Sequence, residues 1–131
     1  MRMNTRHDGS VKIALIEPAA SEVAWIANLV KSGGIPADVN DAIACDHPDI
    51  TDAEIILIGL ESLGETERYA LTSLHEGFPN TPMVVLAGPD AAACSREALS
   101  LGAQLVLSKE RLTAGQLSSA LRFYTHYGSI H

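Results

Sequence analysis

Long aliphatic runs separated by amphipathic segments give the first prediction for this chain. Four runs have the composition of strands covered on both faces: VKIALIE (11–17), EIILIGL (54–60), PMVVLAG (82–88) and AQLVLSK (103–109). A fifth segment, IPADV (35–39), is a shorter and weaker strand candidate. The pattern therefore predicts five strands, four of them strongly buried.

Helical periodicity fills most of the intervals between these strands. Residues 21–32 place an apolar stripe on one side, which ends at Gly33 and Gly34: Val23, Ile26, Leu29 and Val30. Further helices are predicted for residues 65–77 and 113–128, and for residues 91–102, where Asp90 offers an N-cap. The segment 40–49 holds at most a short helix, because Pro48 disfavours helical geometry at the preceding residue.

Strands that alternate with helices over short connections indicate an α/β fold. The prediction is a five-stranded parallel sheet with helices on both faces, joined by right-handed crossovers. The strongest strands end at Glu17, Gly59, Ala87–Gly88 and Lys109. Ligands of such sheets bind beyond the carboxyl ends of the strands, so we expect these four positions to surround one crevice.

Composition and charge exclude several classes of function. The 131 residues fit one domain, for which we predict a leader (1–10), a folded part (11–127) and a tail (128–131). The net charge of −7 argues against a nucleic-acid surface. No apolar run approaches the roughly 20 residues of a membrane span, and the first ten residues lack a signal-peptide core, so a cytoplasmic location without membrane insertion is predicted. The two cysteines and five histidines lack the spacing of metal ligands, and no cofactor is predicted.

From residue 11 to residue 127 the sequence resembles the receiver domains of bacterial response regulators. The likeness is most specific in three segments: TPMVVLAGPD, EALSLGAQLVLSK and LSSALRFY. GAQ before a strand that ends in Lys109, followed by LRFY, is similar to receivers that head GGDEF and EAL proteins of cyclic-di-GMP signalling, such as the FimX-type regulators. The resemblance implies a (βα)5 flavodoxin-like fold with strand order 2-1-3-4-5.

The chemistry of working receivers requires residues that this chain lacks. Family members transfer a phosphoryl group from a histidine kinase to an aspartate at the end of the third strand. That step needs the aspartate as nucleophile, two neighbouring acids that hold Mg²⁺, and donors that neutralise the phosphoryl charge. The resemblance places the acidic pair on Glu17 and Pro18 and the phosphoacceptor on Gly59, which has no side chain to phosphorylate.

Two further family positions also depart from the pattern. The hydroxyl that follows the phosphoryl group falls on Ala87, and the aromatic switch residue falls on Val106; the lysine alone matches, as Lys109. We therefore predict a pseudo-receiver, with no carboxylate in the niche at residue 59 and no enzymatic activity. It would be the N-terminal regulatory module of a multidomain signalling protein, working by protein interaction or self-association.

Several alternatives remain open for the residues around this niche. Lys109 is either a solvated lysine at the sheet rim or the partner of Glu17 or Glu61, in an exposed ion pair worth at most about 1 kcal/mol. Glu17 and Glu61 together form at best a weak cation site. An atypical acceptor such as Glu61 would retain phosphotransfer, and a crevice widened at Gly59 and Ala87 would accept a small ligand.

The final helix carries a second candidate surface. Leu117, Leu121 and Tyr124 suit a core stripe, while Phe123 and Tyr127 are four residues apart on another side, where their rings would either cover the helix edge or contact a protein. Receivers commonly dimerise through the fourth helix, fifth strand and fifth helix. The interface residues implied here are Leu101, Val106, Arg122, Phe123 and Tyr127. The expected partners are other proteins, effector domains of the same chain, or a second copy.

Overall fold

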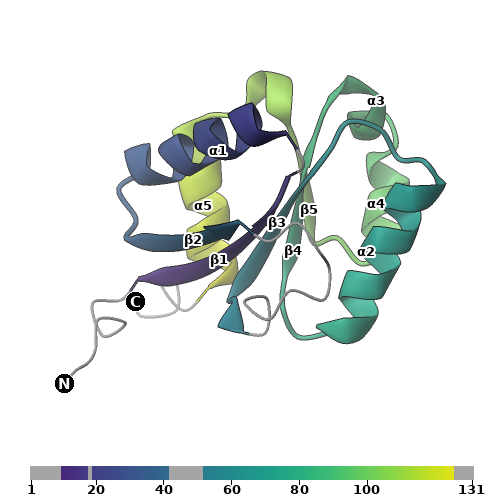
Figure 1. Cartoon of the computed structure of the whole chain (residues 1–131), viewed down its shortest axis with the longest axis horizontal. Coiled ribbons are helices and arrows are strands. Elements are labelled where there is room, and N and C mark those ends of the chain that lie inside the picture. The colour runs from purple at the N-terminus through teal and green to yellow at the C-terminus, as the bar shows by residue number, and fades with distance from the viewer. Residues whose placement is uncertain (1–9, 18, 42–51, 126–131) are drawn as a thin grey trace.

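The computed structural model describes residues 10–17, 19–41 and 52–125 (Figure 1). Their strands form one parallel sheet in the order β2-β1-β3-β4-β5, which confirms the predicted fold class and strand order. The strands are β1 (Val11–Ile16), β2 (Ala37–Asp41), β3 (Ile55–Leu60), β4 (Met83–Ala87) and β5 (Leu105–Ser108). The helices are α1 (Ala20–Ser32), α2 (Glu65–Gly77), α3 (Pro89–Ala92), α4 (Ser95–Ser100) and α5 (Ala114–Tyr124), with a 3₁₀ turn η3 (Lys109–Arg111).

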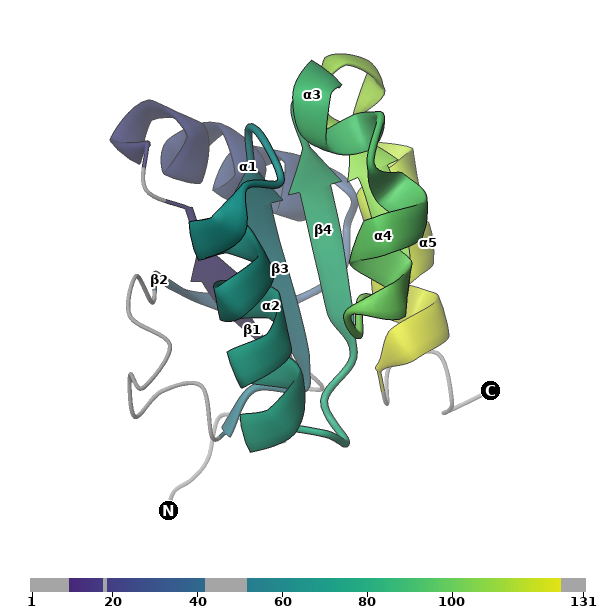
Figure 2. The same cartoon turned by 90° about the vertical axis from the view of Figure 1, so that its right-hand side faces the viewer.

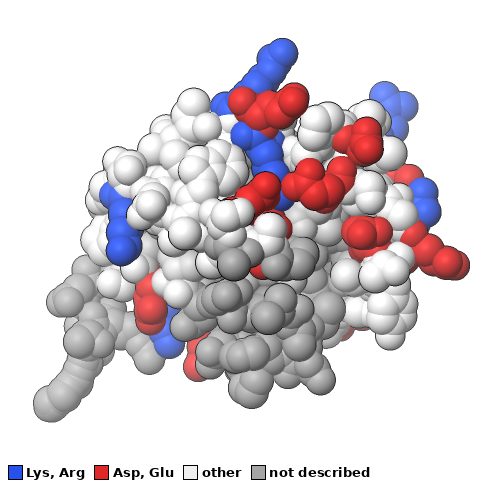
Figure 3. Space-filling model, turned by 45° about the horizontal axis from the view of Figure 1, so that its top comes forward, with Lys and Arg blue, Asp and Glu red and all other residues white. Residues whose placement is uncertain are grey.

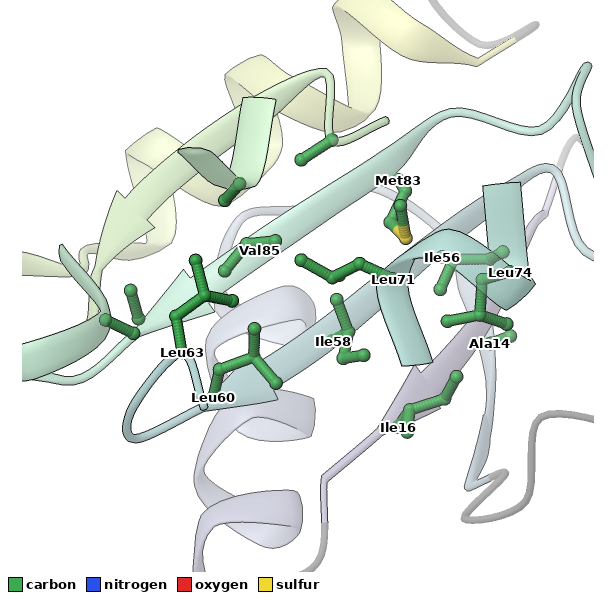
Figure 4. Packing of buried hydrophobic residues seen from close by; sticks show 14 residues of the cluster. Ala14, Ile16, Ile56, Ile58, Leu60, Leu63, Leu71, Leu74, Met83 and Val85 are labelled. Carbon is green, nitrogen blue, oxygen red and sulfur yellow. The ribbon is translucent and has the colours of Figure 1, made fainter. Parts of the chain in front are cut away.

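Helices cover both faces of the sheet, with α1 and α5 on one face and α2, α3 and α4 on the other (Figures 1 and 2). Successive side chains of a strand point to opposite faces, so β3 supplies both cores. Ile55 and Leu57 pack in the cluster under α1 and α5, and Ile56 and Ile58 pack in the cluster under α2 to α4 (Figure 4). Because all six residues of β3 are buried, the strand reads in the sequence as an unbroken apolar run.

The predicted helices largely match the structure, with three corrections. The final helix, expected over residues 113–128, ends at Tyr124, because Thr125 is extended at φ −127° and ψ 173°. Helix α2 has the predicted bounds, and the core stripe of α5 is buried at Leu117 and Leu121. The single helix expected over residues 91–102 is instead two short helices, because Cys94 leaves helical geometry at φ −107° and ψ 26°. Asp90 is not the N-cap: Gly88 holds that place, and Pro89 begins α3, where a missing N–H costs no hydrogen bond.

Two strands differ from their predicted description. β2 begins at Ala37, two residues later than expected. The carbonyl of the preceding residue, Pro36, accepts a hydrogen bond from the N–H of Val11 at 2.9 Å. β5 was expected to be buried, but all four of its residues are only partly buried. The reason is its place at the end of the strand order, where none of the described strands pairs with its other side.

Some predictions concern residues outside those described. These are most of the leader, the tail, the segment from residue 42 to residue 51 with its short helix, Pro18 and Tyr127. Among the helices that the structure does describe, none is long and apolar enough to span a membrane.

Candidate functional site

The register of the strands brings the predicted site residues together at the carboxyl-terminal end of the sheet. Ile16 pairs with Ile58, so Glu17 follows β1 at the level of Gly59 in β3. Ala87, the last residue of β4, pairs with Ser108, the last residue of β5, and Lys109 follows Ser108 in the chain. The expectation that these strand ends meet is confirmed for Glu17, Gly59 and Lys109, which lie within contact distance of one another.

Lys109 is the centre of an ion-pair cluster. Its Nζ donates to Glu17 Oε1 at 2.9 Å and to Glu61 Oε2 at 2.7 Å, and it also donates to Glu22 in the first turn of α1. Four segments of the chain therefore meet on one ammonium group. In Figure 3, acidic and basic side chains gather on this end of the molecule.

Of the two alternatives left open for Lys109, the structure shows the ion pair, with both Glu17 and Glu61, in a setting that was not expected. The side chain of Lys109 is 8% exposed and that of Glu17 is 3% exposed, so their contact is buried rather than the exposed pair expected from the sequence. Glu61, at 65% exposed, is the solvent-facing member. Glu22 was missed, because only the packing of α1 against the sheet brings its carboxylate to the strand ends.

Burial and hydrogen bonding act on Lys109 in opposite directions. Burial alone would lower its pKa, but hydrogen bonds to the carboxylates of Glu17, Glu22 and Glu61 together raise the pKa above the ordinary lysine value. The ammonium form is therefore retained throughout the physiological pH range. One fixed positive charge faces three carboxyl groups.

Gly59 is a requirement of this cluster. A Cβ placed on residue 59 would lie 1.7 Å from Oε1 and 2.7 Å from Cδ of Glu17, and 3.3 Å from Nζ of Lys109. The carboxylate of Glu17 thus occupies the space where a side chain at residue 59 would begin. The expectation of a niche without a carboxylate is wrong in this respect: the niche holds one, supplied by residue 17 and placed beside the amine of Lys109.

The Glu17 carboxylate is held on both of its oxygens. Oε1 accepts from Lys109, and Oε2 accepts from the backbone N–H of Ala19 at 3.1 Å. The residue is 3% exposed. A buried carboxylate whose oxygens are already bonded fills the niche as a packed structural group.

Gly88 has the same relation to Glu61. A Cβ on residue 88 would lie 2.4 Å from Oε1 and 3.1 Å from Cδ of Glu61. The backbone fixes this arrangement, since Gly88 N–H donates to the carbonyl of Leu60 at 2.8 Å and Ala91 N–H donates to that of Glu61 at 3.2 Å. Ala87, at the switch-hydroxyl position, is fully buried in the core. Because residues 59 and 88 lack side chains, the carboxylates of Glu17 and Glu61 can occupy the space beside them.

The Mg²⁺ that receivers use does not fit the residues present. Glu17, Glu22 and Glu61, the three acids of the cluster, all accept from the ammonium of Lys109, so a cation there would have to displace a fixed positive charge. Within the described ranges, no group of three or more His, Cys, Asp or Glu side chains is arranged to hold a metal ion.

A pocket of about 330 Å³ lies beside the cluster, between the ends of β1 and β3 and the start of α2. Its described lining is Ile16, Glu17, Ile58, Gly59, Leu60, Glu61, Thr66, Glu67 and Ala70. A crevice widened at Gly59 and Ala87 was one of the alternatives left open; Glu17 fills the space of a side chain at residue 59, although Gly59 does line the pocket. The open space of the pocket lies beside the side chains of Glu17 and Glu61.

The predicted interface residues that the structure describes lie on both faces of the sheet. Leu101 and Val106 are partly buried and pack against the core under α2 to α4. Phe123 and Arg122 are exposed on α5, on the other side of the sheet. The side chains that lie with Phe123 are those of Leu105 and Leu107, which the sequence analysis did not select.

Solved structures with a similar architecture were found. A protein assigned to pilus assembly (cpaE) from Burkholderia thailandensis superposes with a TM-score of 0.72 at 23% identity, over 87% of this chain and 97% of that one. A pilus assembly-related protein from Burkholderia pseudomallei gives a TM-score of 0.73 at 21% identity, over 95% and 94% of the two chains. A response regulator receiver domain protein from Clostridium thermocellum gives 0.70 at 18% identity, over 92% and 98%.

The sequence comparisons add no family assignment, since no model of a protein family and no curated protein matches this chain. At the identities found, the likeness to the solved structures concerns the fold. Together with the strand order and the helices on both faces, it shows that the chain has the fold of response-regulator receiver domains.

Proposed function

We propose that this chain is a receiver-like regulatory module that accepts no phosphoryl group and acts through contacts with other proteins. The observation that carries the proposal is the position of the Glu17 carboxylate, 1.7 Å from where a Cβ of residue 59 would lie and 2.9 Å from Nζ of Lys109. The space that a phosphoaspartate would need is filled by a side chain of the protein.

The electrostatics of the cluster support the same proposal. In a working receiver the conserved lysine is a donor to the incoming phosphoryl group, by the resemblance stated above. Here the Lys109 ammonium already donates to three carboxylates. A phosphoryl group at the carboxyl-terminal end of the sheet would lie beside these three acids, with neither a free ammonium nor a metal to offset its charge. Transfer to this site is therefore unfavourable.

Incubation with Mg²⁺ and acetyl phosphate, followed by measurement of the intact mass, tests the proposal. We expect no gain of a phosphoryl group, while an active receiver treated in parallel gains one. A gain that persists in Glu61→Gln would overturn the proposal. A gain that Glu61→Gln abolishes would overturn it in favour of the atypical acceptor, since Glu61 is the exposed acid of the cluster.

The pocket of about 330 Å³ supports a second candidate function, the sensing of a small ligand. Its lining combines apolar side chains, among them Ile16, Ile58 and Leu60, with a few polar groups, an arrangement typical of ligand sites. The polar groups are those of Glu17, Glu61, Thr66 and Glu67. A thermal-shift screen against nucleotides and metabolites is the test. A ligand whose shift is lost in Ala70→Trp, which fills the pocket, would support sensing, and the absence of any shift would contradict it.

The cellular context is part of the proposal. The resemblance suggests a context of cyclic-di-GMP signalling, and two of the similar structures carry names that refer to pilus assembly. Deleting the gene in its host and measuring both surface pili and cyclic-di-GMP separates these contexts. Loss of pili at an unchanged nucleotide level supports the pilus apparatus, and a changed nucleotide level supports cyclic-di-GMP signalling.

A further inference from the structure

The pocket of about 330 Å³ beside the ion-pair cluster has a lining of one charge sign. Its described side chains include three carboxylates, those of Glu17, Glu61 and Glu67, and one hydroxyl, that of Thr66. No lysine, arginine or histidine is among its described lining residues. A phosphate, nucleotide or carboxylate ligand would therefore meet charges of its own sign, with no cation in the described lining to offset them.

The rest of the described lining is apolar. Ile16, Ile58 and Leu60 belong to the core cluster under α2 to α4 (Figure 4), and Gly59 and Ala70 add no polar side chain. The volume is near the lower end of the range for ligand pockets, which is roughly 300–1,000 Å³. A ligand suited to this lining is therefore small and has an apolar part.

Two of the carboxylates that line the pocket keep an oxygen without a hydrogen-bond partner among the described residues. Glu61 uses Oε2 to accept from Lys109, which leaves Oε1. Glu67 uses Oε1 to accept from the backbone N–H of Gly64 at 3.0 Å, which leaves Oε2. Glu17, by contrast, has both oxygens engaged. The pocket thus offers negatively charged acceptors that the protein itself does not use.

The neighbouring ion-pair cluster does not neutralise this charge. The single ammonium of Lys109 faces three carboxylates, so the four groups together carry a net charge of −2 when all are ionised. Glu61, which belongs to both the cluster and the pocket lining, is 65% exposed. A positively charged molecule can therefore reach the surplus negative charge from solvent.

We propose that this pocket binds a small organic cation, an amine or guanidinium group attached to a short hydrocarbon body. The cationic group donates to the free oxygens of Glu61 and Glu67, and the hydrocarbon body lies against the apolar lining. An ammonium group is satisfied by a few acceptors and leaves Lys109 in place, whereas Mg²⁺ demands octahedral coordination by oxygens. The inference rests on the second candidate function, ligand sensing, and adds to it the class of ligand.

Binding of such a cation would act on the ion-pair cluster through one shared residue. The carboxylate of Glu61 lines the pocket and also accepts from Lys109 at 2.7 Å. A second positive charge on this carboxylate weakens its attraction for the Lys109 ammonium. Occupancy of the pocket is thereby coupled to the contact that joins the end of β3 to the end of β5.

Titration of the ¹⁵N-labelled full chain, followed by NMR, tests the proposal with three probes of similar size. Benzylamine carries a positive charge, benzyl alcohol none and benzoate a negative charge. We expect benzylamine to shift the backbone amides of residues 58–61 and 64–70 and to bind about tenfold or more tightly than benzyl alcohol, because hydrogen bonds to charged groups are the stronger ones. Benzoate should give no shifts at these residues.

Three variants assign the binding to the free carboxylates and to the pocket. The double variant Glu61→Gln, Glu67→Gln should weaken benzylamine binding by about tenfold or more and leave that of benzyl alcohol unchanged. Glutamine keeps an acceptor for the N–H of Gly64, and the spectra themselves report whether the variant is folded. Glu76→Gln is the matched control and should change neither affinity, because Glu76 is an exposed residue of α2 that does not line the pocket. Ala70→Trp fills the pocket without altering its charge and should abolish the shifts from benzylamine.

Several results would overturn the proposal. These are equal affinities for benzylamine and benzyl alcohol, tighter binding of benzoate, benzylamine shifts that persist in Ala70→Trp, and the absence of benzylamine shifts at residues 58–61 and 64–70. Each of them rejects the cationic class alone, since the thermal-shift screen decides ligand sensing separately with nucleotides and other metabolites. The phosphoryl-transfer test is independent of both.

Discussion

Replacing Gly59 with alanine is the most direct test of how the ion-pair cluster is built. The added Cβ would lie 1.7 Å from Oε1 of Glu17, whereas real Cβ contacts begin near 3.0 Å. Oε1 therefore has to move by more than one ångström. Because it is the end of a flexible side chain, the clash itself is relieved at little cost. The cost comes from the contact that the movement breaks.

The magnitude follows from that contact. Oε1 accepts from Nζ of Lys109 at 2.9 Å, and both side chains are more than nine-tenths buried. A hydrogen bond to a charged group contributes about 1.5–3 kcal/mol to stability. Alanine in place of glycine inside a strand returns about 0.5–1 kcal/mol, since less chain entropy is lost on folding. We expect Gly59→Ala to lower the free energy of unfolding by about 1–2 kcal/mol.

Urea denaturation measures this change, and a second background isolates its cause. In Glu17→Ala the carboxylate is absent, so the added Gly59→Ala should be neutral or slightly stabilising. Gly77→Ala is the matched control, because no atom lies within 4 Å of its added Cβ. Equal stability of Gly59→Ala and the unmodified protein would refute the argument. So would an unchanged loss in the Glu17→Ala background, since the cost would then come from the backbone.

Three further predictions concern the same cluster. Lys109→Met leaves the buried carboxylate of Glu17 without its ammonium, so we expect it to lower the free energy of unfolding by about 3 kcal/mol in urea denaturation, whereas the exposed Lys31→Met should change it by less than about 0.5 kcal/mol. Folding raises the pKa of Lys109, so its contribution to stability is complete below the unfolded lysine pKa of about 10.4. That contribution is lost as the pH rises through the higher pKa of the folded state. Unfolding curves in alkaline buffer should show this loss, and those of Lys109→Met should lack it. Calorimetric titration with Mg²⁺ should give no binding heat, and submillimolar binding would show that a cation displaces Lys109 from Glu17 and Glu61.

Most of the fold could be predicted from local pattern. A strand covered on both faces has to be apolar throughout, and β3, with all six residues buried, met that condition along its whole length. The same reasoning failed for β5, because LVLS reads like a buried strand and only its place at the sheet edge leaves it partly exposed. The helix over residues 91–102 was predicted as one element for a similar reason: its apolar spacing does not reveal the break at Cys94.

The candidate site could be predicted only in part. The ends of the strands identified Glu17, Gly59 and Lys109, since a parallel sheet brings its carboxyl ends to one edge. Glu22 carries no such signal, because its contact depends on how α1 packs on the sheet. The interface prediction selected Val106, which strand alternation places on the face under α2 to α4, whereas Leu105 and Leu107 lie on the face under α5.

By itself, the sequence determined the order of the elements, because this order depends on short-range periodicity. It also determined that residue 59 has no side chain and that a lysine ends the last strand, because these are matters of residue identity. Only the tertiary structure decided what fills the space left at residue 59. A glycine can leave a cavity or admit a neighbour, and the outcome depends on atoms from distant segments. Here the carboxylate of Glu17 and the ammonium of Lys109, 92 positions apart in the chain, meet at 2.9 Å in that space, since burying either charge alone would cost far more than burying the pair.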